Sequence, residues 1–363
     1  MPYQKPPKIC PVCEKEADFK FIQDYKSDDG KWSLYECSGC RVQFWQPMKA
    51  PGRDWYEAEA ESWRIRSTPR EKIKLSWQHK EFLKVFEKEN NKGKKLLDLG
   101  CGAGDFLSAA QKIGFETWGV DFDQGAIKHA KSLYNLKNVY AEPIEDFFKE
   151  KDLPKFDVIT FFEVIEHLDD IPRFLNSLIE IGKDGAYIIL STPNRERGDP
   201  SNPKINDLPP KHLTRWDYNS LNHILRLHNI SIEKHKYGDE VEYFISKYFR
   251  LGTVRKLQRM RQKEDNLNKK DSKINKVVIF VYSLARIKDY FLTPIAWLIV
   301  NTLKLFKVYK GGDCIFLVGK INKSRRQVSS PSASLYSICR RPAFISSANR
   351  LCSIKANLLK CGF

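Results

Sequence analysis

Apolar and polar residues follow two rhythms along the middle of the chain. From Lys94 onward, short apolar runs typical of strands are separated by segments in which apolar residues recur at helical spacing. These runs predict strands at 95–100, 117–121, 138–141, 157–162 and 186–192, with helices near 103–113, 124–134 and 170–181. Such alternation is typical of a parallel sheet with helices on both faces. The predicted fold class is therefore α/β, with a doubly wound, Rossmann-like sheet.

Further elements flank this predicted core. Ile73, Trp77, Phe82 and Phe86 recur at helical spacing with charged residues between them, which predicts a helix within residues 70–90. After the core, a loop rich in Pro and Asn precedes three more predicted elements, namely a helix near 217–228, a strand near 230–236 and a final strand at 311–321.

The stretch before the final strand is basic and then apolar. Residues 249–276 hold ten Lys/Arg and three Asp/Glu, and the apolar runs 277–285 and 291–303 follow. Each run is shorter than the roughly 20 residues that span a bilayer. Two interpretations stay open: residues 249–308 contact a membrane surface peripherally, or they form a helical insert packed on the domain or on a second subunit.

The net charge of +17 is unevenly distributed. Residues 249–276 and the Ser-rich, acid-free residues 324–363 carry +7 each, which leaves +3 for the rest of the chain. The predicted core is thus nearly neutral, and nucleic acid is not the favoured partner. The tail 324–363 has no periodicity and is predicted to be disordered.

The nine cysteines and the first residues indicate a compartment. Residues 1–9 lack the apolar run of a secretory signal, so we expect a cytoplasmic chain, or one bound peripherally at the inner face of the membrane. Thiols stay reduced in the cytosol, so the cysteines are expected to be metal ligands or buried thiols and not disulfides.

Two of the cysteine pairs have the spacing of a zinc site. Cys10 and Cys13 form one CxxC turn, and Cys37 and Cys40 form a second, with 23 residues between the pairs. Four thiolates can hold Zn²⁺ in a closed tetrahedral site, which would be structural. Zinc ribbons often bind nucleic acid, but residues 1–50 have eight Lys/Arg against seven Asp/Glu. We therefore favour a lid or docking module for an enzyme.

A glycine-rich loop at 98–104 (DLGCGAG) follows the first predicted strand and precedes a helix. Its glycines allow a tight turn close to a ligand, and the helix start offers unpaired N–H groups to a carboxylate. Asp121 ends the second strand, where an acid can accept both hydrogen bonds of a ribose diol. A lone glycine loop is also typical of a structural turn; the combination with Asp121 favours a nucleotide-like ligand. Its spacing is not the GxGxxG of dinucleotide-binding folds.

These residues resemble the class I S-adenosylmethionine-dependent methyltransferases over about 70–236 and the last strand. The resemblance implies that the methionine end of the cofactor lies at the loop, at positions Asp98, Gly100, Cys101, Gly102 and Gly104. It also implies that Asp121 binds the ribose, that Phe122 lies against the adenine and that Phe162 touches the cofactor. Pro143 stands near the place where the family often has an acid for the adenine amine, so that role is unassigned.

A second cluster of ionisable residues follows the fourth predicted strand. Glu163, Glu166 and His167 lie where doubly wound sheets bind ligands. They can hold a divalent cation or provide a general base, or Glu166 and His167 can merely brace the turn. The pattern resembles ubiquinone-synthesis O-methyltransferases and small-RNA 3'-terminal 2'-O-methyltransferases, which implies magnesium at these positions and His212 as a further ligand in the RNA group. The same motif also occurs in methyltransferases with no known metal.

The segment 207–216 is the predicted substrate loop. Two prolines stiffen it, and His212, Arg215 and Trp216 offer a base, a cation and a flat apolar surface. A rigid connector with Trp216 packed on the domain is the structural alternative. The loop resembles one in bacterial methyltransferases of glycan and lipid-carrier pathways, which favours substrate contact.

The sequence thus predicts an S-adenosylmethionine-dependent methyltransferase, with His167, His212 and Glu163 as candidate catalytic residues. The acceptor would be a hydroxyl of a small molecule, glycan or lipid-linked intermediate. The alternatives are an RNA 2'-O-methyltransferase and a non-catalytic zinc-ribbon binding protein. The predicted parts are a zinc-ribbon module (1–50), a linker with a helix (51–93) and a methyltransferase core (94–240). A helical insert (241–310), the final core strand (311–323) and a tail (324–363) follow.

Overall fold

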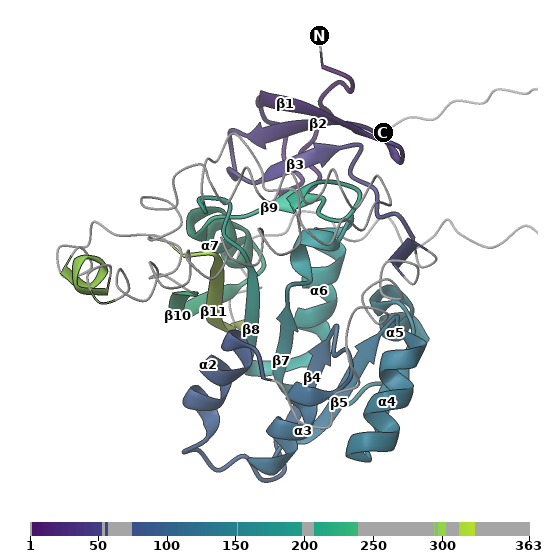
Figure 1. The fold of residues 1–363 in the computed structure, drawn as a ribbon, viewed down its shortest axis with the longest axis vertical. Coiled ribbons are helices and arrows are strands. Elements are labelled where there is room, and N and C mark those ends of the chain that lie inside the picture. The colour runs from purple at the N-terminus through teal and green to yellow at the C-terminus, as the bar shows by residue number, and fades with distance from the viewer. Residues whose placement is uncertain are drawn as a thin grey trace, which may run out of the picture. The chain divides into compact units, whose positions relative to one another are not determined.

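The central sheet of the chain contains seven strands in the part that the structure, a computed structural model, describes. The described residues are 2–52, 55–56, 75–150, 152–197, 207–238, 294, 297–302 and 312–323. Along the sheet the strands are β10 (Ile230–Gly238), β11 (Cys314–Ile321), β8 (Gly182–Pro193), β7 (Phe156–Phe162), β4 (Lys95–Leu99), β5 (Glu116–Asp121) and β6 (Asn138–Ala141) (Figure 1).

The strand directions match a doubly wound sheet. Strands β8, β7, β4, β5 and β6 pair in parallel, whereas β11 is antiparallel to both β8 and β10. The order reverses at β4, so its carboxyl end and that of β7 border the crevice where such folds bind ligands. The predicted α/β class is confirmed.

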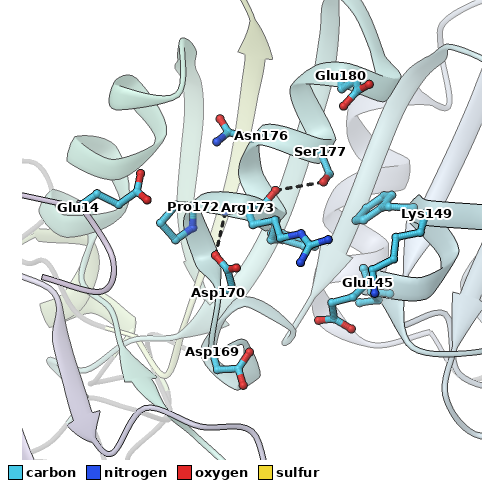
Figure 2. A pocket seen from close by; sticks show the side chains of 13 residues that line it. Glu14, Glu145, Lys149, Asp169, Asp170, Pro172, Arg173, Asn176, Ser177 and Glu180 are labelled. Carbon is cyan, nitrogen blue, oxygen red and sulfur yellow. Dashed lines mark hydrogen bonds between the residues drawn. The ribbon is translucent and has the colours of Figure 1, made fainter. Parts of the chain in front are cut away.

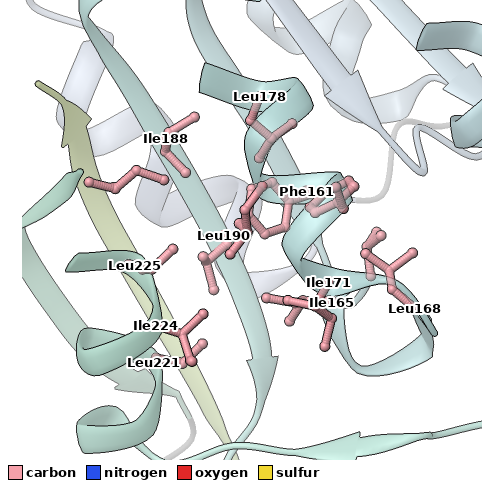
Figure 3. Close-up of a cluster of buried hydrophobic side chains, with 14 of the residues drawn as sticks. Phe161, Ile165, Leu168, Ile171, Leu178, Ile188, Leu190, Leu221, Ile224 and Leu225 are labelled. Atoms are coloured by element: carbon pink, nitrogen blue, oxygen red, sulfur yellow. The ribbon is translucent and has the colours of Figure 1, made fainter. Parts of the chain in front are cut away.

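Helices pack on both faces of this sheet. One apolar cluster contains side chains of α2 (Trp77–Phe86), α3 (Asp105–Lys112) and α4 (Gln124–Tyr134). The other contains side chains of α5 (Ile144–Glu150), α6 (Ile171–Ile181) and α7 (Tyr218–Leu227), and Figure 3 shows part of it. In β8, Ile188 and Leu190 belong to the second cluster and Ile189 to the first, because successive strand residues point to opposite faces.

Helix starts after the strands are fixed by local capping. The Asp123 side chain accepts a hydrogen bond from the backbone N–H of Ala126 at the start of α4, and Asp170 accepts one from Arg173 at α6. Asp217 forms a capping box with Ser220 at α7. These short side chains satisfy N–H groups that a helix leaves unpaired at its start, and they place each helix directly after its loop.

The N-terminal module contributes three strands to a second sheet, which has four strands. Its order is β1 (Phe19–Ser27), β2 (Gly30–Cys37), β3 (Gln43–Gln46) and β9 (Thr214–Arg215), paired antiparallel throughout. The edge strand β9 comes from the predicted substrate loop, far away in the sequence. Sequence reasoning did not foresee this pairing.

Several predictions fall partly or wholly outside the described residues. The helix predicted within 70–90 is seen as Trp77–Phe86, and the final strand begins at Cys314 and not at 311. Of the predicted insert 241–310, only 294 and 297–302 are described, and the tail 324–363 is not. Among the described residues, no helix has the length and apolar character needed to cross a membrane.

Candidate active site

The glycine-rich loop after β4 is shaped by its backbone. Gly100, Gly102 and Gly104 have φ angles of 79°, 51° and 81°, a region that side chains disfavour. The N–H of Gly102 donates to Oδ2 of Asp121 (2.9 Å), and the N–H of Asp123 donates to Oδ1 of the same carboxylate (2.9 Å). The Asp121 carboxylate is therefore held rigidly beside the loop.

The loop glycines have different steric roles. A Cβ on Gly104 would lie 2.6 Å from Cδ1 of Leu136, so this glycine lets helix and loop pack closely. A Cβ on Gly102 would meet nothing within 4 Å, so this glycine faces open space. That space beside a fixed carboxylate can accept a ligand.

A cavity of about 500 Å³ opens beside this loop. Gly100, Asp121, Phe122 and Phe162 form part of its wall, at the carboxyl ends of the strands. Other lining residues, from the segments after β3, β6 and β7 and before β9, are Ala50, Gly52, Tyr56, Pro143, Ile144, Glu145, Glu163, Val164, His167, Leu168, Asp169 and Lys211. An apolar cavity with a few convergent polar groups is typical of a small-molecule site.

Asp98 and Cys101 lie behind the cavity wall and are buried. Burial and, to a smaller extent, the nearby Asp121 raise the pKa of Asp98 to about 8, although the Thr160 hydroxyl, which donates a hydrogen bond to its Oδ1 (2.7 Å), opposes the rise. Burial raises the pKa of the Cys101 thiol well above its usual range.

The raised pKa of Asp98 predicts a pH-dependent stability. The fold favours neutral Asp98, so its stability falls as the pH rises from about 4, the usual aspartate value, to about 8. Asp98→Asn cannot ionise and keeps an acceptor for Thr160. In urea unfolding of the ligand-free protein, we expect Asp98→Asn to gain on the order of 3 kcal/mol over the unsubstituted chain between pH 5 and pH 8.5. Asp28→Asn, on an exposed turn, should show no such gain; a pH-independent difference for Asp98→Asn would contradict the prediction.

The turn after β7 separates two neighbouring glutamates. Glu163 has a φ of 56°, and its Oε1 accepts hydrogen bonds from the hydroxyl of Ser191 (2.9 Å) and the thiol of Cys314 (3.2 Å). Glu166 lies in the 3₁₀ helix η1 (Ile165–His167), and its Oε2 accepts a hydrogen bond from Thr192 (3.0 Å). The two carboxylates thus make different contacts.

Glu166, His167 and His212 form a compact group whose ligand atoms lie within 4.8 Å of one another. Nε2 of His167 is 3.9 Å from Oε1 of Glu166, and the His167 and His212 rings are perpendicular at 4.7 Å. Oε1 of Glu166 is buried and makes no hydrogen bond. Glu163, predicted as a magnesium ligand with Glu166 and His167, is not in this group, because its backbone turns it toward Ser191 and Cys314.

The protonation of His167 follows from its contacts. Its Nδ1 lies 2.6 Å from the carbonyl oxygen of Lys211, which only accepts, so Nδ1 carries the proton and Nε2 has a free lone pair. Burial and the neighbouring His212 lower the pKa of His167 to about 3. Burial and the Glu163 carboxylate raise the pKa of Glu166 well above its usual range.

The four cysteines of the N-terminal module also converge. Cys10, Cys13, Cys37 and Cys40 are buried, and their Sγ atoms lie within 4.8 Å of one another. The Sγ–Sγ distances are 3.8 Å for Cys10 and Cys40 and 4.0 Å for Cys13 and Cys37. At a Zn–S length of about 2.3 Å, a tetrahedral site has S–S separations of roughly 3.8 Å. These two distances are therefore compatible with a zinc ion held by the four cysteines.

Residues 70–235 match the family model described as a methyltransferase domain. This stretch contains the glycine loop, Asp121, Glu166 and His212, whose geometry is given above. This part of the chain is therefore similar to methyltransferase domains. It is similar to the mitochondrial ubiquinone biosynthesis O-methyltransferase of Schizosaccharomyces pombe, with 38% identity over 116 residues, which covers 31% of this chain and 42% of that protein.

Further similar proteins are also methyltransferases. The ubiquinone biosynthesis O-methyltransferase of Glaesserella parasuis is 35% identical over 112 residues, covering 28% of this chain and 47% of the relative. The chain thus matches less than half the length of these curated relatives. A solved S-adenosylmethionine-dependent methyltransferase from Archaeoglobus fulgidus is 18% identical, with a TM-score of 0.37 and coverage of 74% of this chain and 94% of that one. The two curated relatives are O-methyltransferases, and they favour neither the RNA alternative nor the non-catalytic one.

Two residues of the predicted substrate loop are buried and do not line the cavity. Trp216 is fully buried, and its indole N–H donates to Thr214 (2.9 Å). Arg215 is buried and donates to Oε1 of Gln43 in β3 (2.8 Å). Substrate contact by Arg215 and Trp216 stays a prediction, and the structural alternative accounts for their contacts. His212 does lie beside the catalytic candidates.

Sequence reasoning missed three residues at the site. Asp207 forms an ion pair with Arg197, and its Oδ1 lies 3.6 Å from Nδ1 of His212. Burial alone would raise the pKa of Asp207, but His212 and Arg197 lower it below the usual value. Tyr56 lines the cavity, with its ring 5.3 Å from Phe122 and 6.0 Å from His167. Asp207 is the first residue of the predicted substrate loop and Arg197 precedes that loop in the chain, but only the fold shows that the two contact each other.

A second cavity of about 670 Å³ adjoins the first (Figure 2). The two share Ile144, Glu145 and Asp169 as lining residues. Its wall also includes Glu14 of the N-terminal module and Arg173 of α6, so the module and this helix both border it. Oδ2 of Asp169 accepts a hydrogen bond from the N–H of Ala50 (2.9 Å), which joins the end of the N-terminal module to the domain.

Proposed function

We propose that the protein transfers a methyl group from S-adenosylmethionine to a hydroxyl of a small molecule, glycan or lipid-linked intermediate. One observation carries the proposal: the Asp121 carboxylate and His167 line the same 500 Å³ cavity. A donor held by one wall would present its methyl group to an acceptor held by the other. In-line displacement at a sulfonium carbon needs mainly this positioning.

The donor side is proposed to work as follows. Both Asp121 oxygens accept a backbone N–H, and each keeps a lone pair for a ribose hydroxyl. The open space at Gly102 would receive the methionine end, near the N-terminus of α3, with Asp98 behind it. Phe122 and Phe162 would give the adenine and sulfonium parts an apolar wall. When bound, S-adenosylmethionine supplies the electrophilic methyl group.

The acceptor side is proposed to use His167 as general base. Its Nδ1 is fixed by the Lys211 carbonyl, so Nε2 can take the proton of an acceptor hydroxyl. His212, whose ring lies against that of His167, would orient it and is itself held near Asp207. Glu163 lines the cavity and, with Oε1 bonded to Ser191, could orient the acceptor.

A divalent cation at Glu166, His167 and His212 is a second candidate for the same side. The unpartnered, buried Oε1 of Glu166 beside two imidazoles supports it. A metal there would polarise the hydroxyl that is to be methylated. Two imidazoles and one carboxylate suit a transition metal better than the magnesium expected from the sequence, because magnesium prefers oxygen ligands.

The metal content of the purified protein separates these candidates. A metal at both sites predicts one zinc bound by the cysteines and a second divalent ion per chain, the latter lost in His212→Ala. The base mechanism predicts one zinc and no second ion. Inductively coupled plasma mass spectrometry on both proteins measures this, with His223→Ala, an exposed histidine of α7, as the control.

Calorimetry with S-adenosylmethionine and with its demethylated product tests the donor. If neither binds, the proposed function fails. Transfer of a labelled methyl group to a panel of hydroxyl-bearing aromatic, glycan and lipid-linked compounds then identifies the acceptor class. Peripheral membrane contact through residues 249–308 stays a separate prediction, which flotation with anionic liposomes at low salt tests.

A further inference from the structure

The N-terminal module is hydrogen-bonded directly to the acceptor side of the site. Its strand β3 begins three residues after Cys40 and pairs with β9, at Gln43 with Arg215 and at Phe44 with Thr214. The N–H of Trp45 then donates to the carbonyl of Leu213 (2.9 Å). Leu213 is the neighbour of His212 in the chain.

The contacts continue from Leu213 into the 3₁₀ helix η1. The N–H of Leu213 donates to the carbonyl of Glu166 (2.7 Å), and the Thr214 hydroxyl donates to that of Ile165 (3.4 Å). The backbone of Glu166 is therefore hydrogen-bonded to the same short segment that contains His212. Glu166 and His212 belong, with His167, to the group of three described above.

A buried arginine adds a second connection. Arg195, which follows β8, donates to the carbonyl of Arg41 next to Cys40 and forms ion pairs with Asp217 and Glu36. Asp217 caps α7, directly after β9. Through Arg195, the turn around Cys40 is thus connected to the segment that follows β9.

The donor side has no such connection among the contacts described. The glycine loop and Asp121 are held by β4, β5 and their own hydrogen bonds, for example from Gly100 to the Val120 carbonyl (2.8 Å). The module reaches the shared cavity through Ala50 and Gly52, which follow β3. The two walls of the cavity therefore depend on different parts of the chain.

We propose that metal binding by Cys10, Cys13, Cys37 and Cys40 positions Glu166 and His212 beside His167, the member of their group that lines the cavity, and so assembles the acceptor side without affecting the donor side. In this proposal the cysteines hold the metal, and strand β3 together with Leu213 and Arg195 transmits its effect to the positions of Glu166 and His212. This inference rests on the proposed function for the meaning of the two sides. The link from the four-thiolate site to the Leu213–Glu166 hydrogen bond does not depend on the proposed function.

Amide hydrogen exchange of the full chain tests the link without any acceptor. In Cys40→Ser, which removes one thiolate, we expect the Leu213 amide to exchange at least ten-fold faster, while Leu97 and Leu99 in β4 keep their rates. The Leu213 amide is informative because its acceptor, Glu166, lies outside the module. Asp28→Ala, an exposed position in the β1–β2 turn, is the matched control and should change neither.

A second variant covers the case in which Cys40→Ser fails to fold. Gln43→Leu keeps all four cysteines and removes the Arg215–Gln43 hydrogen bond. We expect it to retain one zinc and to accelerate Leu213 exchange several-fold. Unchanged Leu213 exchange in a metal-free Cys40→Ser protein with protected β4 amides would overturn the proposal, as would unchanged exchange in zinc-loaded Gln43→Leu.

Donor binding separates this proposal from the proposed function. Calorimetry with the demethylated donor product should give affinities within about three-fold for Cys40→Ser, Gln43→Leu and the unsubstituted chain. A large loss of affinity in zinc-loaded Gln43→Leu would show that the module also holds the donor side, against the proposal. If the unsubstituted chain binds no donor, the proposed function fails, while the exchange result still decides the link.

Discussion

Asp121→Ala should abolish measurable donor binding. The substitution removes the two oxygens proposed to accept the ribose hydroxyls, and it also removes the acceptor for the N–H groups of Gly102 and Asp123. Hydrogen bonds to a charged group contribute about 1.5–3 kcal/mol each, so two of them correspond to a loss of at least about 100-fold in affinity. Isothermal titration calorimetry with S-adenosylmethionine measures the change.

The same strand provides the control. Glu116, at the opposite end of β5, is exposed, and Glu116→Ala removes a carboxylate without touching the cavity. Its donor affinity should match that of the unsubstituted chain. A folded Asp121→Ala protein that binds the donor within ten-fold of normal would show that the ligand lies elsewhere, and the donor side proposed here would be wrong.

The second large effect is expected at His167. In His167→Asn, the side-chain amide can still donate to the Lys211 carbonyl, but no group with a basic lone pair replaces Nε2. Loss of a general base lowers turnover by roughly 10²- to 10⁴-fold. We therefore expect kcat for methyl transfer to fall within that range, with donor affinity nearly unchanged.

His223→Asn is the matched histidine control, since His223 lies on the exposed side of α7 and does not line the cavity. Its kcat should be normal. Normal kcat in His167→Asn as well would exclude His167 as the base and would turn attention to His212. A pH–rate profile is less informative here, because burial holds the pKa of His167 at about 3, well below the working range.

The core of the fold could be predicted because each of its elements is encoded locally. Strands such as β7 are mostly apolar, as expected where both faces of a parallel strand are covered. Asp123, Asp170 and Asp217 mark helix starts within a residue or two of the prediction. The predicted donor residues are also encoded locally, since the glycine loop and Asp121 come at the ends of neighbouring parallel strands, and their role in donor binding stays a prediction.

The acceptor side was only partly predictable. Spacing placed Glu163, Glu166 and His167 together, but the positive φ of Glu163 sends its carboxylate to Ser191 and Cys314 instead. A helical-face argument cannot anticipate such a backbone turn. Its place in the group of three is taken by His212, which lies 49 residues after Glu163 in the chain.

The sequence by itself therefore determined the sheet, the glycine-rich loop and the two CxxC turns, because periodicity, glycines and cysteine spacing act over a few neighbouring residues. Only the tertiary structure decided what the N-terminal module does to the rest. The pairing of β3 with β9 depends on two segments about 170 residues apart, and their alignment follows from packing and not from local propensity. That pairing buries Arg215 and Trp216, which the sequence assigned to the substrate, and it brings His212 to Glu166.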